Sequence, residues 1–212
     1  MDSLARVSWE EMFKGDFAAD DVRAYGELVE HLHGVQDALA SMPMDRESID
    51  GLAADLAGWR KRLEPLATDE QHQVNGRVAE LPVRGHAMLP ELLVTSRTRD
   101  RVEGTVRFGR WFMGGGMAVH GGAVTLLFDE VLGILASLNA GGITRTAYLN
   151  TSYRALTPID TELEAVVWID RVEGRKWFLR GELRHGDVVC AEAEGLFLRL
   201  LPEQGLGKRT TD

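Results

Sequence analysis

Apolar residues recur at three- and four-residue spacing in two stretches near the start of the chain. The first stretch runs from Asp21 to Met42, begins with acidic residues and ends at Pro43. The second runs from about Arg46 to Leu66, with Pro65 close to its end. Its apolar stripe consists of Ile49, Leu52, Leu56, Trp59 and Leu63. Two amphipathic helices joined by a short break predict a helical hairpin.

A third apolar stretch, from His120 to Asn139, has almost no polar face. It opens with His120-Gly121-Gly122 and is interrupted by the adjacent carboxylates Asp129 and Glu130. A helix of this kind is expected inside a domain, where a carboxylate needs a partner, a raised pKa or a chemical role. Two carboxylates near the middle of an apolar run also make insertion into a membrane costly, so we expect no membrane insertion.

From Glu91 onward the apolar period changes to two, except in that helix. A hairpin is expected around Arg99-Asp100-Arg101. Further strands are expected at 145–154, 162–171, 176–184 and 188–200, with tight turns at 173–175 and 185–187. Parallel strands need helical crossovers, which these short turns cannot provide. The pattern predicts an α+β fold in which an antiparallel sheet curls around one central helix.

Residues 67–89 are polar and aperiodic, so they are interpreted as the linker or lead-in to the main domain. We therefore divide the chain into an N-terminal helical region with a linker (1–88), a main domain (89–202) and a flexible tail (203–212).

Composition and charge narrow the classes of partner. The 212 residues are 44% hydrophobic and 27% charged, which suits one globular domain with an appendage. With 24 basic and 33 acidic residues the net charge is −9, which argues against nucleic acid as the main partner. The single cysteine, Cys190, excludes an internal disulfide and a thiolate metal cluster, and it is interpreted as a buried strand residue. No metal site is predicted. Residues 1–17 lack an apolar signal region, so we expect a cytoplasmic protein.

Three motifs together resemble the HGG-type hotdog-fold acyl-CoA thioesterases, the group that includes the phenylacetate-pathway thioesterases and the animal thioesterase superfamily members. The motifs are HGGAVTLLFDEVLG, TAYLNTSYRALTP and VEGRKWF, and the resemblance covers about Leu89 to Leu200. It implies a hotdog fold and a homodimer, or a dimer of dimers, whose central helices lie side by side. Thioester hydrolysis is then expected at the dimer interface.

The resemblance also implies roles for individual residues. Gly121 would supply a backbone N–H to the thioester oxygen, and Asp129 would act as general base or nucleophile. His120 occupies the orienting position of the motif. Thr146 matches a threonine of the animal members that belongs to the site.

Helix geometry independently favours a shared site. A helix N-terminus offers unpaired N–H groups, and Gly121 and Gly122 leave it accessible because they have no Cβ. Gly121 and Asp129 are eight residues apart, about 12 Å along one helix at 1.5 Å per residue. A base and an oxyanion donor must both reach the same carbonyl, so one chain cannot supply both. Two antiparallel copies would, which predicts hydrolysis only by a dimer.

An acidic protein that binds coenzyme A needs local cations for its phosphates. Arg154, Arg175 and Lys176 are the candidates, with Gly122 and Asn150 as further substrate-binding candidates. The family commonly has a Lys-Arg-Pro-like stretch where this chain has Arg154-Ala155-Leu156. A solvated pair of hairpin charges is the alternative interpretation of Arg175 and Lys176.

The other candidates also have structural alternatives. Asp129 could be paired structurally or exposed, Glu130 is interpreted as a structural or interface partner, and His120 could only cap the helix. Thr146 could be an ordinary strand residue. A fatty or aromatic acyl group is expected from apolar residues that could equally form the core, namely Val124, Leu127, Leu132 and Leu135.

The sequence thus predicts an acyl-CoA thioesterase that needs no cofactor, since coenzyme A is part of its substrate. One alternative on the same fold is an enoyl-CoA hydratase, whose Asp-x-Asn-Pro-x-x-His-like motif is absent. The other is a non-catalytic acyl-CoA sensor or dimeric interaction module that docks through the helical hairpin.

Overall fold

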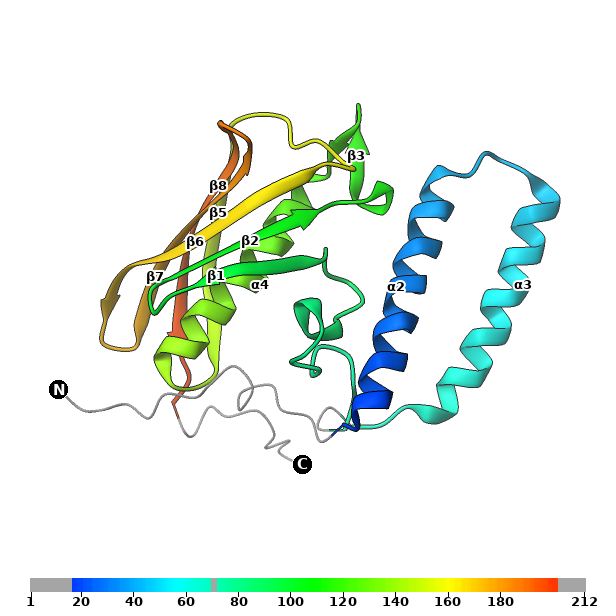
Figure 1. Ribbon diagram of the computed structural model, residues 1–212, viewed down its shortest axis with the longest axis horizontal. Coiled ribbons are helices and arrows are strands. Elements are labelled where there is room, and N and C mark those ends of the chain that lie inside the picture. Colours follow the sequence, from blue (N-terminus) through cyan, green and yellow to red (C-terminus); the bar gives the residue numbers. More distant parts are fainter. Residues whose placement is uncertain (1–16, 70–71, 202–212) are drawn as a thin grey trace, which may run out of the picture.

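The computed structural model describes residues 17–69 and 72–201, in which a six-stranded antiparallel sheet wraps around one long helix (Figure 1). The helix, α4, spans Gly121–Ala140. The sheet order is β1-β2-β6-β7-β8-β5. The strands are β1 (Leu92–Arg97), β2 (Arg101–Arg107), β5 (Thr144–Tyr153), β6 (Glu162–Glu173), β7 (Lys176–His185) and β8 (Val188–Arg199). The predicted α+β architecture and its central helix are confirmed.

The core lies between α4 and the concave face of the sheet. Nine residues of α4 are buried: Ala123, Val124, Leu127, Phe128, Val131, Leu132, Leu135, Ala136 and Ala140. Opposite them, Leu163, Ala165 and Val167 of β6 alternate inward as the period of two predicts. Cys190 is buried in β8, as expected, and burial raises the pKa of its thiol. α4 is long and apolar enough to span a membrane by length and composition, and its apolar residues form this core.

Edge strand β5 contains a bulge that reverses its alternation. Thr146 pairs with Phe197, but the next paired residue, Tyr148, already faces Leu196, so Ala147 is the extra residue. As a result, Thr146 before the bulge and Tyr153 after it both face α4, although one is even-numbered and the other odd-numbered.

The N-terminal region forms the predicted helical hairpin, α2 (Ala19–Ser41) and α3 (Arg46–Leu63), followed by the short helix η1 (Glu64–Leu66). Neither α2 nor α3 has a buried residue. Polar contacts hold α2 to the rest of the chain: Tyr25 Oη donates to the Gly85 carbonyl at 3.2 Å, and the Trp111 N–H donates to Asp37 Oδ1 at 2.8 Å. Figure 1 shows α3 on the outer side of α2.

Residues 76–89, expected to be part of a linker, instead pack against the central domain. Val78, Val83 and Leu89 are buried, the last two in the same core as α4. The short helix η2 (Pro82–Gly85) holds Val83 and Arg84 in the left-handed region, at φ of 43° and 58°. Such backbone is costly for non-glycine residues unless the surroundings enforce it. The interpretation of these residues as a linker is therefore wrong. Individual buried side chains hold the segment against the domain, and such contacts leave no repeating apolar pattern in the sequence.

Three short elements before α4 were also not predicted: η3 (Arg110–Phe112), β3 (Met113–Gly115) and β4 (Ala118–Val119). They are too short for a period to be recognisable. The tail at 203–212 lies outside the described residues.

Candidate active site

The N-terminus of α4 is capped by His120. Its Nδ1 accepts a hydrogen bond from the Gly122 N–H at 3.0 Å, so His120 does cap the helix. Among the residues that the structure describes, none accepts a hydrogen bond from the Gly121 N–H. That donor points out of the helix terminus with the positive end of the helix dipole behind it, an arrangement that suits a developing negative charge.

Tyr153, which the sequence did not single out, lies against the same helix terminus. Its hydroxyl donates to the Gly121 carbonyl at 2.8 Å and lies 3.0 Å from Thr125 Oγ1. A Cβ at Gly121 would lie 2.9 Å from this hydroxyl, so glycine is needed for the close approach. The peptide group between Gly121 and Gly122 is therefore held at both ends. Tyr153 binds its carbonyl, and His120 binds its N–H.

Asp129 lies two turns further along α4 and accepts a hydrogen bond from Thr146 Oγ1 at 2.8 Å. The structure thus brings Asp129 and Thr146 together. We expected α4 to be buried on all sides, and within a single chain this is wrong. The side of α4 next to edge strand β5 is open, and it exposes Asp129.

Glu130 points to another side of α4 and forms an ion pair with Arg84. Both side chains are largely buried, and Arg84 Nε also donates to the Gly76 carbonyl at 3.0 Å. The structural role expected for Glu130 is confirmed. His86 lies near this pair, and burial is the main cause that lowers the pKa of its imidazole.

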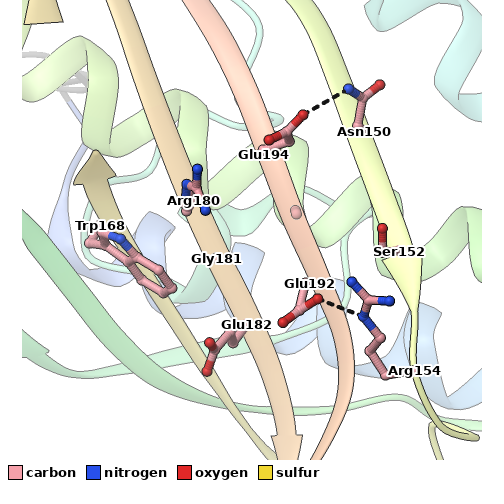
Figure 2. A pocket seen from close by; sticks show the side chains of 10 residues that line it. Asn150, Ser152, Arg154, Trp168, Arg180, Gly181, Glu182, Glu192 and Glu194 are labelled. Carbon is pink, nitrogen blue, oxygen red and sulfur yellow. Dashed lines mark hydrogen bonds and ion pairs between the residues drawn. The ribbon is translucent and has the colours of Figure 1, made fainter. Parts of the chain in front are cut away.

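Asn150 and Arg154 lie on the opposite face of the sheet from α4. Asn150 Nδ2 donates to Glu194 Oε1 at 3.2 Å, and Arg154 Nε pairs with Glu192 Oε2 at 2.6 Å. Figure 2 shows them lining a polar hollow with Trp168, Arg180 and the glutamates of β7 and β8. The volume of this hollow is about 210 Å³. The structure therefore does not bring either residue to Asp129 or Gly121 of the same chain.

Arg175 and Lys176 are exposed at the turn between β6 and β7. The strand pairings place this turn near the C-terminal end of α4. Lys176 pairs with Leu198 of β8, and the next residue, Arg199, pairs with Thr144 of β5. Thr144 in turn contacts Ser137 near the end of α4. Arg154 lies at the other end of β5, so the three candidate cations do not form one cluster in a single chain.

The four apolar residues considered as an acyl lining are core residues. Val124, Leu127, Leu132 and Leu135 are at most 1% exposed, which leaves no surface for a ligand.

Comparisons with known proteins agree with the fold. Residues 116–192 match the thioesterase superfamily. The chain is 35% identical to acyl-coenzyme A thioesterase THEM4 of Bos taurus over 88 residues, which are 41% of this chain and 35% of that protein. It is 30% identical to acyl-coenzyme A thioesterase THEM5 of Homo sapiens over 87 residues, 40% of this chain and 35% of that protein. The chain thus spans about a third of the length of these curated relatives.

The crystal structure of a thioesterase superfamily protein superposes with a TM-score of 0.70 at 27% identity, covering 82% of this chain and 94% of that one. This coverage exceeds residues 89–202 alone, so it includes part of the N-terminal helical region. The matched segment, the sheet wrapped around α4 and the named relatives confirm the resemblance read from the motifs: the chain has the hotdog fold, and residues 116–192 are similar to the thioesterase superfamily.

Proposed function

We propose that this protein is an acyl-CoA thioesterase that hydrolyses its substrate at the interface of a homodimer. One observation carries the proposal: the exposed Asp129 carboxylate and the Gly121 N–H, for which no described residue is an acceptor, lie on one helix, eight residues apart. At about 1.5 Å per residue, the two groups are about 12 Å apart and cannot act on the same carbonyl. A second chain would complete the site.

A second chain packed antiparallel along the open side of α4 would complete two such sites, one at each end of the paired helices. β5 is a ten-residue strand at the edge of the sheet, so its outer backbone groups are available to a second β5. In that arrangement Asp129 of each chain would face Gly121 of the other. The partner would also cover Asp129, which one chain leaves exposed.

The reaction would begin with water attacking the thioester carbonyl carbon while Asp129 accepts its proton. Thr146 donates to Asp129 Oδ1, which leaves Oδ2 to receive that proton. The carbonyl oxygen becomes an oxyanion that the partner's Gly121 N–H stabilises. When the carbonyl re-forms, the carbon–sulfur bond breaks, and the coenzyme A thiolate leaves with the proton returned by Asp129.

The substrate would be an acyl-CoA, and coenzyme A would be present only as part of it. In the antiparallel dimer, the β6–β7 turn of one chain lies toward the helix N-terminus of the other. Arg175 and Lys176 of one chain could therefore meet the nucleotide phosphates of a substrate bound at the partner's Gly121. A cytoplasmic location remains part of the proposal.

Two variants and their mixture test the shared site. Asp129→Asn keeps the shape of the side chain but removes the base, so hydrolysis should fall by about 10²–10⁴-fold while acyl-CoA binding persists. Gly121→Ala introduces a Cβ that meets Tyr153. Mixed dimers of the two variants contain one site with both native residues, so refolding or co-expressing them together should restore up to about half of the wild-type activity per mixed dimer.

No recovery in verified mixed dimers would exclude the shared site. Tight acyl-CoA binding with no release of free coenzyme A by the wild type would instead favour the non-catalytic sensor. Hydration of an enoyl-CoA without hydrolysis would favour the hydratase. A panel of acyl-CoA substrates with thiol detection separates these outcomes.

A further inference from the structure

The first turn of α4 begins with two consecutive glycines, Gly121 and Gly122, and the first of them carries the N–H proposed to bind the oxyanion. Glycine has the widest choice of backbone conformations and loses the most entropy on folding, so a pair of glycines favours fraying of a helix end. An oxyanion donor lowers a reaction barrier only if it already points at the place where the charge develops. Contacts from outside the turn are therefore needed to hold this donor in one direction.

Tyr153 makes such a contact from β5. Its hydroxyl donates to the Gly121 carbonyl at 2.8 Å, which restricts rotation about the backbone bond that follows the Gly121 N–H and Cα. His120 holds the next N–H of the same turn, that of Gly122. The two side chains thus fix a turn whose own residues leave it free.

The Tyr153 hydroxyl is in turn held by two threonine hydroxyls. Thr125 Oγ1 lies 3.0 Å from Tyr153 Oη and 3.1 Å from Thr151 Oγ1. Gly121 and Thr125 are four residues apart and share one side of α4, while Thr151 and Tyr153 are two apart and share one face of β5. The hydroxyls form a chain from the strand to the helix terminus, and hydrogen bonds in such a chain strengthen one another.

We infer that Tyr153 is a positioning residue for thioester hydrolysis, which keeps the Gly121 N–H in the direction that stabilises the oxyanion. The inference rests on the proposed function. Tyr153 acts through the backbone of Gly121 and transfers no proton. Thr125 acts one step further away, because it holds the hydroxyl of Tyr153.

Tyr153→Phe removes only the hydroxyl and tests this role in the full-length protein, with acyl-CoA as substrate and thiol detection. It should lower kcat by about 5–10-fold and leave KM within about twofold, because the donor acts on the oxyanion more than on the bound substrate. The shape of the pH–rate profile should stay unchanged, since no proton donor is lost. Tyr148→Phe is the matched control: Tyr148 lies on the other face of β5, with Asn150, and its variant should keep the wild-type kcat.

A double-variant cycle tests whether Thr125 acts through Tyr153. Thr125→Val keeps the branched shape without the hydroxyl and should lower kcat by about 2–3-fold. Added to Tyr153→Phe it should have no further effect, because the hydroxyl that it holds is already absent. Hydrogen exchange of the Gly122 amide, measured by NMR, should accelerate in Tyr153→Phe and stay unchanged in Tyr148→Phe, which tests the contact without requiring hydrolysis.

Three results would overturn the inference in a protein whose wild type hydrolyses acyl-CoA and whose Asp129→Asn variant does not. They are an unchanged kcat in Tyr153→Phe, a rise in KM alone, and a changed shape of its pH–rate profile, which would make Tyr153 a proton donor. Full multiplication of the effects of Thr125→Val and Tyr153→Phe would overturn the role of Thr125. No hydrolysis by the wild type would overturn the proposed function, and this inference with it.

Discussion

The two apolar helical regions of this chain differ in how they are covered. α4 buries nine residues against the sheet, while α2 and α3 bury none. On one side of α4, Arg84 forms an ion pair with Glu130. On another side, threonine hydroxyls of β5 form hydrogen bonds with α4. The hairpin is held to the sheet domain by polar contacts of α2, such as the one between Asp37 and Trp111.

Helices with similar apolar periodicity can therefore have different structural roles. In α4 the apolar positions form the core, and the one open side carries the polar groups proposed for catalysis. In the hairpin the apolar positions remain at the surface, because residues 17–69 and 72–201 supply no further layer over them. Helices of this length gain most of their stability from packing, so the hairpin is expected to be the less stable part.

The largest expected effect comes from removing the ion pair that ties α4 to residues 76–89. Arg84→Met leaves the buried Glu130 carboxylate without its partner, which should lower the free energy of unfolding by about 3–5 kcal/mol. Urea unfolding followed by tryptophan fluorescence measures this. The double variant Arg84→Met with Glu130→Gln should recover much of the loss, because no unpaired charge remains. A loss below about 1 kcal/mol in the single variant would mean that Glu130 is solvated in solution.

A paired truncation compares the two regions directly. Leu132 in α4 is fully buried and Leu56 in α3 is 44% exposed. Leu132→Ala removes core packing and should cost about 2–5 kcal/mol of unfolding free energy. Leu56→Ala, measured on protein dilute enough to exclude association, should cost well under half as much. Equal losses would show that α3 is covered within a single chain.

The sequence predicted α4, the hairpin and the main strands well because each has a long, uninterrupted period. It could not predict the role of residues 76–89, where Val83 and Arg84 are fixed by individual long-range contacts. The bulge at Ala147 was a second obstacle. Strict alternation from Thr146 would place Asn150 and Arg154 facing α4 and Tyr153 facing away, and the structure shows the reverse. The resemblance assigned Asp129 and Thr146 to one site; no local pattern indicated the contact of Tyr153 with Gly121.

A smaller effect is expected where α2 meets the sheet domain. Asp37→Ala removes the acceptor for the Trp111 N–H, a charge-assisted hydrogen bond whose loss should cost about 1–2 kcal/mol of local stability. Hydrogen exchange should accelerate in α2 and α3 and stay unchanged in α4. The neighbouring Ala38→Ser change, on an exposed position, serves as the control. Faster exchange throughout α4 would contradict the view that the hairpin is a separately stabilised unit.

The smallest effect concerns pH and the buried segment beside α4. Burial is the main cause that lowers the pKa of His86 below its ordinary 6.5; the charge of Arg84 acts in the same direction and that of Glu130 opposes it. Below about pH 6.5 the unfolded chain binds a proton that the folded chain does not, so the free energy of unfolding should fall with decreasing pH. The effect is small because the ring is only partly buried. His86→Gln should flatten the dependence between about pH 5 and 7, whereas His31→Gln, at an exposed position of α2, should leave it unchanged. If His31→Gln flattened the dependence as much as His86→Gln, the pH sensitivity would belong to the hairpin and not to the segment packed beside α4.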